Sequence, residues 1–218
     1  PEADVEGMDA CRKIAILSSI VSGRQVDFED IYTEGITKIT AQDMRYAKEM
    51  NMVIKLLATM KQEDGTIGAI VAPFLLHSEH PLASVHGVFN AIFVRGNALG
   101  DSMFYGSGAG KMPTASAVTA DIVEAARYQD RTICEYWSGN KMELKSRMDV
   151  KRKFFIRMAG RKEAYADRIR EAFGEVQYLT ADGCEGEFAF VTGEIKEGEY
   201  ESAAAEFGNL IHMIRVAS

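Results

Sequence analysis

Residues 52–76 read M-V-I-K-L-L-A-T-M-K-Q-E-D-G-T-I-G-A-I-V-A-P-F-L-L and give the strongest signal for the structure of the first half of the chain. Residues 52–60 and 67–76 are rich in side chains that favour β-strands. Between them stands Asp64-Gly65, a dipeptide suited to the positive backbone dihedrals of a tight hairpin turn. We therefore predict an antiparallel pair of strands over this run.

Signals for helices lie on both sides of this pair, and a second pair of strands follows it. The first helix ends before Gly23, and the hydroxyl of Thr40 can cap the next one. We predict helices over residues 7–21, 40–50 and 115–128, and strands over residues 88–94 and 99–105. The first part of the chain is thus expected to be an α+β domain with helices packed on a mostly antiparallel sheet.

The second part of the chain has a different order of elements. Residues 129–149 are charged and weakly periodic, which predicts a connector. The sequence then predicts strands over residues 154–158, 176–180, 188–194 and 211–216, and helices over residues 162–173 and 200–207. Along the chain their order is strand, helix, strand, strand, helix, strand. This order is the ferredoxin-like βαββαβ plan, a common small-molecule or pairing module. We therefore predict two domains, residues 1–128 and 150–218.

The composition argues against several classes of function. The 218 residues carry 25 basic and 32 acidic side chains, and the formal charge of -7 predicts no binding to nucleic acid or to an anionic membrane. Cys11, Cys134 and Cys184 are widely separated and indicate neither a disulfide framework nor a zinc knuckle, so we expect a reducing cytoplasm. No apolar stretch approaches the roughly 20 residues of a membrane-spanning helix. Because the first residue is Pro1 rather than methionine, we expect a piece of a longer protein.

Asp9 and Lys13 are the first candidate for chemistry. They stand four residues apart in the first predicted helix, so their side chains lie on one face and can form an ion pair. Ile16 and Ile20 continue that face, which predicts that the pair points toward protein rather than bulk water. A lysine in such surroundings gives up its proton more readily and suits a general acid or base. An ordinary pair on the helix surface remains the alternative.

The glycine-rich run Y-G-S-G-A-G-K-M-P-T-A-S, residues 105–116, is the second candidate. Gly106, Gly108 and Gly110 allow a ligand to approach the backbone, and the start of the following helix carries partial positive charge. The spacing fits neither a Walker phosphate loop nor the dinucleotide-binding fingerprint. A mobile turn before a helix is the alternative interpretation.

A group of histidines suggests a metal site, which the spacing does not support. His77, Glu79, His80 and His86 lack the H-E-x-x-H pattern that places two imidazoles on one helical face. Pro81 also favours a loop here. We therefore predict no metal site.

Four blocks of sequence, taken together, resemble homoserine dehydrogenase. They are D-V-E-G-M-D-A-C-R-K at residues 4–13, F-E-D-I-Y-T-E-G-I at 28–36, H-P-L-A-S-V-H-G-V-F-N-A at 80–91 and M-F-Y-G-S-G-A-G-K-M-P-T-A-S-A-V at 103–118. The resemblance covers residues 1 to about 128. In that family a pyridine-nucleotide domain precedes this region, and hydride passes between NADPH or NADH and C4 of homoserine or aspartate 4-semialdehyde.

The resemblance implies roles for the charged residues near the N-terminus. It makes Lys13 the proton donor and acceptor for the C4 oxygen of the substrate, and Asp9 the group that holds lysine and substrate in register. Asp4 resembles a substrate-binding carboxylate that accepts from the ammonium group. The family's substrate-binding glutamate lies just upstream of this block, so Glu2 is not assigned that role.

The same resemblance places the cofactor, NADP or NAD, at the glycine-rich run. Gly110 resembles the backbone position that meets the nicotinamide side, and Gly108 and Ala109 shape that approach. The domain that would bind most of the nucleotide lies outside this sequence. We therefore expect the 218 residues by themselves neither to bind NADPH tightly nor to turn over substrate.

Residues 150–218 resemble the ACT domain found at the C-terminus of many such enzymes, where threonine is sensed. Many ACT domains bind an amino acid near a D-x-P-G turn after the first strand, whereas this chain has A-G-R-K-E-A at residues 159–164. The fold survives that change even where ligand binding is lost. The resemblance thus implies either a threonine sensor or a pairing module, and the family is usually a homodimer.

Two functions from different classes follow from the sequence. The first is a portion of an NAD(P)-dependent homoserine oxidoreductase of threonine, methionine and isoleucine biosynthesis. The second is a stand-alone amino-acid-binding regulatory protein without catalysis. A strand followed by G-x-G-x-x-G upstream of Pro1 would favour the first, and a start codon there the second.

Overall fold

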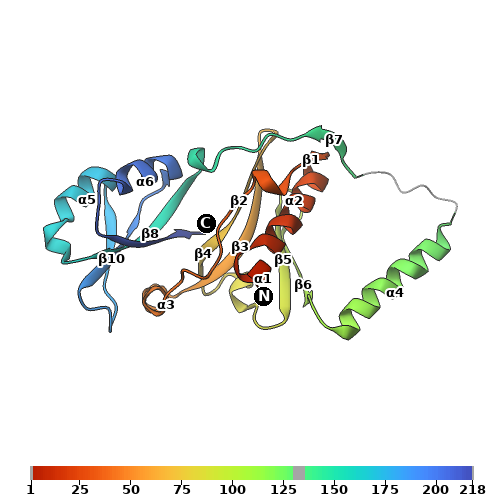
Figure 1. The fold of residues 1–218 in the computed structure, drawn as a ribbon, viewed down its shortest axis with the longest axis horizontal. Helices are drawn as coiled ribbons and strands as arrows, with labels where there is room; N and C mark the ends of the chain where they lie inside the picture. The colour runs from red at the N-terminus through yellow and green to blue at the C-terminus, as the bar shows by residue number, and fades with distance from the viewer. Residues whose placement is uncertain (1, 130–135, 218) are drawn as a thin grey trace. The chain divides into compact units, whose positions relative to one another are not determined.

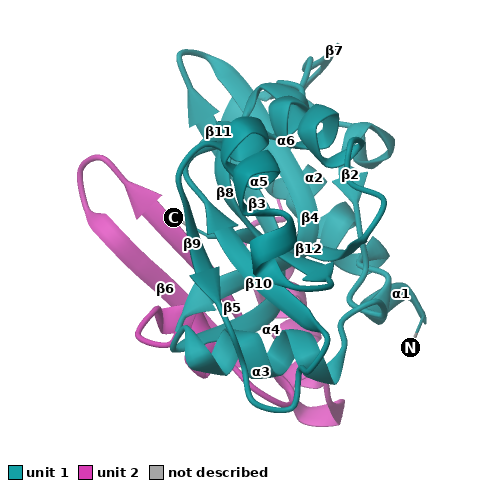
Figure 2. Ribbon diagram, turned by 90° about the vertical axis from the view of Figure 1, so that its left-hand side faces the viewer, with its two compact units in different colours: residues 1–77, 136–218 teal, residues 78–135 magenta. Residues whose placement is uncertain are grey.

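The computed structural model describes residues 2–129 and 136–217, and the chain forms two compact units. Unit 1 comprises residues 1–77 and 136–218, and unit 2 comprises residues 78–135 (Figure 2). This division differs from the predicted domains, because unit 1 combines segments from both ends of the sequence. Among the described residues, no helix has the length and apolar character needed to cross a membrane.

The hairpin predicted from residues 52–76 is confirmed. β3 (Met52–Glu63) and β4 (Thr66–His77) pair antiparallel from end to end, with Glu63 opposite Thr66. The turn residues have positive φ angles, 50° at Asp64 and 76° at Gly65, as a tight turn of this kind requires. β4 is buried along most of its length and forms the centre of unit 1.

β4 belongs to a sheet that continues across the predicted domain boundary. The order in this eight-stranded sheet is β2 (Tyr32–Thr33), β4, β12 (Leu210–Val216), β8 (Lys151–Ala159), β10 (Glu187–Thr192) and β9 (Val176–Leu179), with β3 beside β4 and β11 (Ile195–Lys196) beside β8. β12, the dark blue strand that leads to the C-terminus in Figure 1, runs parallel to β4 and antiparallel to β8. The last strand therefore joins the two halves of the sequence, and most pairs in the sheet are antiparallel, as predicted.

Three helices of unit 1 come from the N-terminal part, namely α1 (Glu2–Val5), α2 (Met8–Ser22) and α3 (Ala41–Glu49). α2 packs against β3 and β4, and α3 packs against β3. α2 ends at Gly23 with a φ of 66°, as predicted. α3 begins after Thr40, whose hydroxyl accepts from the Asp43 N–H, so the predicted cap is confirmed.

The C-terminal part of unit 1 contains β8, α5 (Ala166–Phe173), β9, β10, α6 (Glu197–Ala204) and β12, in the order predicted. Aromatic rings fill its core, where Phe173 contacts Phe190 and Phe207. α5 begins later than predicted because residues Lys162–Ala164 form a 3-10 turn. α6 begins earlier because the Glu199 carboxylate accepts from the Lys196 N–H and starts the helix.

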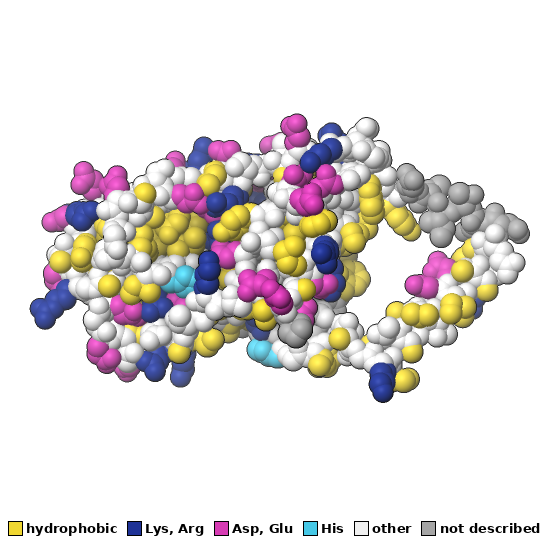
Figure 3. Space-filling view, in the orientation of Figure 1, with side chains coloured by type: hydrophobic (Ala, Val, Ile, Leu, Met, Phe, Trp, Pro, Cys, Tyr) yellow, Lys and Arg dark blue, Asp and Glu magenta, His cyan; other side chains and the backbone are white. Residues whose placement is uncertain are grey.

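Unit 2 contains a hairpin and a long helix. β5 (Phe89–Gly96) pairs with β6 (Gly100–Ser107), close to the predicted pair. α4 (Lys111–Arg127) begins before the predicted residue 115, and Pro113 fits in its first turn because the N–H groups there need no partner within the helix. Hydrophobic side chains lie exposed along α4 (Figure 3), Met112, Val118, Ile122 and Val123 among them.

The described part of the predicted connector makes contacts within unit 1. β7 (Ser138–Lys141) pairs with β1 (Arg24–Gln25), and Leu144 bridges to Ile67 in β4. Residues 130–135 of the connector, with Cys134, lie outside the described residues. These contacts hold the segment that leads into β8 against the first half of the sequence.

Candidate active site

Three of the predicted site residues lie on two adjacent helices of unit 1. Asp4 lies on α1, and Asp9 and Lys13 lie on α2. Gly7 separates the helices with a φ of 79°. A Cβ at Gly7 would lie 3.0 Å from the Val71 side chain, so glycine allows this junction to pack directly on β4.

The predicted ion pair between Asp9 and Lys13 forms. Lys13 Nζ lies 2.6 Å from Asp9 Oδ2, and the lysine and aspartate side chains are 66% and 47% exposed. The helical spacing therefore brings the two groups together as expected. Their exposure leaves the lysine nitrogen accessible to a small molecule on the surface of unit 1.

The predicted orientation of this pair toward protein is wrong. α2 buries a different face, formed by Cys11, Ile14, Ala15 and Ser18. Ile16 and Ile20, which follow the ion pair, are 51% and 44% exposed. This prediction failed because α2 is apolar on most sides. The apolar stripe of Ile16 and Ile20 therefore did not identify the face of the helix that contacts the sheet.

The loop at residues 33–37 holds the junction of α1 and α2. The Ile36 N–H donates to the Val5 carbonyl at 2.8 Å, and the Thr37 hydroxyl donates to the Glu6 carboxylate at 3.0 Å. A Cβ on Gly35 would lie 2.6 Å from the Val5 carbonyl oxygen, so this position requires glycine. Sequence reasoning missed this loop, because Thr37 and its partner stand 31 residues apart. The block F-E-D-I-Y-T-E-G-I at residues 28–36 was the feature of the sequence that could have pointed to this loop.

The glycine-rich turn lies in unit 2 and is held by its own contacts. Gly106 pairs with Asn90 within the hairpin, and the Gly108 N–H donates to the Val88 carbonyl at 3.2 Å. A Cβ on Gly108 would overlap the side chain of Asn90. The glycine at residue 108 therefore allows the backbone to pack closely against Asn90.

The start of α4 leaves backbone N–H groups accessible to a ligand. Gly110 precedes the helix with a φ of 127°, and no side chain caps the first turn. That turn contains no acidic residue and begins with Lys111, which adds to the positive end of the helix dipole. Gly108 and Ala109 are exposed beside it. The geometry suits a polar or negatively charged group.

The histidines considered for a metal site have other contacts. His80 Nδ1 accepts from the Leu82 N–H at 3.1 Å, and its ring lies 4.9 Å from that of Phe93. Burial, followed by the positive charge of Arg95, lowers the pKa of His80. Over residues 2–129 and 136–217, no three His, Cys, Asp or Glu side chains are grouped so that they could hold a metal ion.

The sequence that carries these residues is similar to that of known enzymes. A family model of homoserine dehydrogenase matches residues 1–123, which include Asp4, Asp9, Lys13 and the start of α4. The homoserine dehydrogenase of Bacillus subtilis is 45% identical over 123 residues, covering 56% of this chain and 28% of the relative. That of Synechocystis is 35% identical over 233 aligned positions, covering 96% of this chain and 53% of the relative.

Solved structures extend the likeness to the whole chain. The crystal structure of a homoserine dehydrogenase from Thiobacillus denitrificans matches 100% of this chain with a TM-score of 0.87 at 31% identity. A homoserine dehydrogenase from S. aureus matches with a TM-score of 0.80 at 28% identity. Each match covers 55% of the solved chain, so this chain spans about half the length of those proteins.

Proposed function

This chain belongs to the homoserine dehydrogenase family, and from that premise we propose that the protein containing it interconverts L-homoserine and L-aspartate 4-semialdehyde with NADP or NAD. The observation that carries the proposal is the match of residues 1–123 to the family, a segment in which Asp9 and Lys13 form an ion pair of 2.6 Å on α2. Asp4 lies on the preceding short helix α1, and the loop at residues 33–37 holds the end of that helix by a backbone hydrogen bond. We place the reaction in cytoplasmic threonine, methionine and isoleucine biosynthesis.

In this proposal Lys13 moves the proton of the reaction. When the semialdehyde is reduced, the Lys13 ammonium donates a proton to the C4 oxygen, and when homoserine is oxidised the same nitrogen takes the hydroxyl proton. Asp9 accepts from Lys13 and keeps its nitrogen in place. Asp4 accepts hydrogen bonds from the ammonium group of the substrate. The nicotinamide cofactor, when bound, accepts or supplies the hydride.

The start of α4 fits contact with part of that cofactor. Gly110 offers backbone atoms where a side chain would be strained, and the first turn carries no acidic group that would repel a phosphate or a carboxamide oxygen. Gly108 and Ala109 allow close approach. This chain contains no dinucleotide fingerprint. We therefore propose that most of the nucleotide binds to a separate domain, which corresponds to the part of the relatives that this chain does not cover. The 218 residues by themselves are then inactive.

For residues 150–218 we propose an ACT-like module with threonine as its effector and a role in homodimer formation. Its strands β12, β8, β10 and β9 are adjacent in that order, and α5 and α6 connect them. The turn after β8 contains Gly160, with a φ of 110°, followed by a 3-10 turn. Calorimetry with threonine distinguishes a sensor, which gives heat of binding, from a module that only pairs chains.

The test compares the full-length protein that contains this chain with its Lys13→Met variant. We expect kcat to fall about 10²- to 10⁴-fold, the usual contribution of a general acid or base. The free energy of unfolding should change by less than about 0.5 kcal/mol, because the lysine is exposed. Steady-state oxidation of homoserine and urea unfolding measure the two quantities.

Lys61→Met is the matched control, since Lys61 forms an exposed pair of the same length with Glu63 at 2.6 Å. It should leave kcat and stability unchanged. Equal activity of Lys13→Met and Lys61→Met would contradict the proposed role of Lys13. Turnover by the 218 residues at the full-length rate would contradict the need for a separate nucleotide domain.

A further inference from the structure

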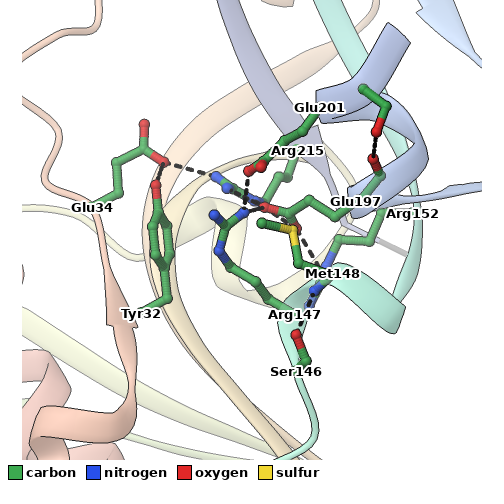
Figure 4. A network of polar contacts seen from close by, with 11 residues as sticks. Tyr32, Glu34, Ser146, Arg147, Met148, Arg152, Glu197, Glu201 and Arg215 are labelled. Carbon is green, nitrogen blue, oxygen red and sulfur yellow. Dashed lines mark hydrogen bonds and ion pairs between the residues drawn. The ribbon is translucent and has the colours of Figure 1, made fainter. Parts of the chain in front are cut away.

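A network of charged side chains, buried at its centre, joins the C-terminal part of unit 1 to the loop at residues 33–37 (Figure 4). We call it the Arg215 network. Its members are Tyr32, Glu34, Arg147, Arg152, Glu197, Glu201 and Arg215. Three guanidinium groups thus face two carboxylates from α6 and the distant carboxylate of Glu34.

Arg215 is the centre of this network. Its Nη2 lies 2.6 Å from Glu197 Oε1 on α6, and its Nη1 lies 2.8 Å from Glu34 Oε2. The Arg215 side chain is 2% exposed and that of Glu197 is fully buried. Burial works against the charge of Arg215, but the two carboxylates outweigh it and raise its pKa. A buried charge held in this way has few alternative positions, because leaving a partner unpaired is costly.

Aromatic contacts fix the end of the network at Glu34. The guanidinium of Arg147 lies over the Tyr32 ring, 4.2 Å from its centroid, and that of Arg215 lies 5.3 Å from the same ring. The Tyr32 hydroxyl donates to Glu34 Oε2 at 3.3 Å. Glu34 is therefore held by groups from both β2 and β12.

Glu34 is also the member of the network that leads to the candidate active site. Its backbone N–H donates to the Val71 carbonyl at 2.8 Å, and Ile36, two residues on, holds the Val5 carbonyl at the end of α1. The Gly7 N–H donates to the Asp4 carbonyl at 3.2 Å within the same segment. Only this short loop separates the buried charges from the backbone that carries Asp4.

We propose that Glu34 is a positioning residue, through which Arg215 and the C-terminal part of unit 1 fix the α1–α2 segment where Asp4 and Lys13 meet the substrate. The role of that segment in binding substrate rests on the proposed function. The contact between Glu34 and Arg215 does not depend on it. The C-terminal part thereby acquires a mechanical role in the reaction, separate from any effector it binds.

Amide hydrogen exchange of the 218-residue chain tests the contact without substrate. In Glu34→Ala, we expect the exchange of the Ile36 and Gly7 amides to rise about tenfold, because local opening of the loop becomes easier. The amides of Ala159 and Gly160, which bond to Asn209 and Gly186 in the C-terminal part, should change less than about twofold. Glu34→Gln keeps an oxygen for Arg215 and should restore most of the protection.

Glu201→Ala is the matched control. The Glu201 carboxylate accepts from Arg147 Nη1 in the same network at 2.7 Å, but it is 42% exposed and lies on α6. It should leave the Ile36 and Gly7 amides unchanged. No rise at these amides in Glu34→Ala, or an equal rise at all four amides, would show that the network only stabilises the fold and would overturn the proposal.

A second arm measures kinetics in the full-length protein. Glu34→Ala should raise KM for homoserine about tenfold while kcat changes less than about threefold, because the loop holds α1 with Asp4 more directly than α2. An unchanged KM beside faster exchange would overturn the positioning role. A full-length protein that does not oxidise homoserine at all would contradict the proposed function, whereas the exchange result would still decide the contact.

Discussion

Asp43 connects α3 to the C-terminal part of unit 1 through a single buried carboxylate. Its Oδ1 lies 2.8 Å from Arg157 Nη1, and its Oδ2 lies 3.0 Å from His212 Nδ1 and 2.8 Å from the Thr40 hydroxyl. Burial raises the pKa of Asp43, but the hydrogen bonds from His212, Arg157 and Thr40 outweigh burial and hold the pKa well below the usual aspartate value.

At the residue scale we predict that Asp43→Asn lowers the free energy of unfolding at pH 7 by about 3 kcal/mol, because Arg157 loses a buried charged partner. A depressed pKa in the folded state contributes stability above the unfolded pKa, near pH 4, and the contribution is lost as the pH falls further. The difference between parent and variant should therefore shrink below about pH 4. Urea unfolding at pH 7 and pH 3.5 measures it.

Asp167→Asn is the control for this prediction, because Asp167 is 94% exposed in its pair with Arg170. Its effect should stay within about 0.5 kcal/mol at both pH values. A difference for Asp43→Asn that grows on acidification would contradict the assigned direction of the pKa shift.

At the scale of elements, the junction of α1 and α2 depends on a close approach of two backbones. At Gly35, a Cβ would lie 2.6 Å from the Val5 carbonyl oxygen and 2.7 Å from Glu6 Cα. Neither backbone atom belongs to a flexible side chain, so one segment has to move. The helix that carries Asp4 is therefore held by sterics as well as by hydrogen bonds.

We predict that Gly35→Ala lowers the free energy of unfolding by about 1–3 kcal/mol, the usual effect of overpacking. Gly68→Ala is the comparison, since a Cβ there meets only the Lys145 Cβ, at 3.9 Å. Within β4 this change should be neutral or stabilising by about 0.5–1 kcal/mol. Thermal and urea unfolding of both variants measure the effects, and equal stability of the two would refute the steric argument.

At the scale of the whole molecule, β12 determines how the parts of unit 1 stabilise each other. Ile214 on this strand is 1% exposed and belongs to a core cluster with Leu75 of β4 and Phe155 of β8. The core thus combines side chains from both ends of the sequence. Unit 1 is expected to unfold as one cooperative structure.

Ile214→Ala should lower the free energy of unfolding by about 2–5 kcal/mol, the usual range for such a buried truncation. Exchange of amides in β4 and in β10 under mild denaturant should report the same loss. Ile211→Ala, on the same strand but 45% exposed, should cost less than about 1 kcal/mol. Loss of protection in β10 with β4 unaffected would mean that the halves unfold independently.

Features that depend on neighbouring residues could be predicted from the amino-acid sequence. The Asp64-Gly65 turn fixed the register of β3 and β4, Thr40 and Gly23 placed helix ends, and the spacing of Asp9 and Lys13 produced their ion pair. Each of these signals acts over a few residues, where dihedral preferences and helical periodicity decide the outcome. The quoted blocks likewise identified the family.

Contacts between distant segments could not be predicted from the sequence and became known only from the folded structure. Pairing of β12 with β4, and the bond between Arg215 and Glu34 across 181 residues, have no local signal. The face of α2 that turns to the sheet was also undetermined, because Ile16 and Ile20 are as apolar as the residues it buries. These choices follow from packing and from the pairing of buried charges, which depend on the whole fold rather than on any short stretch of chain.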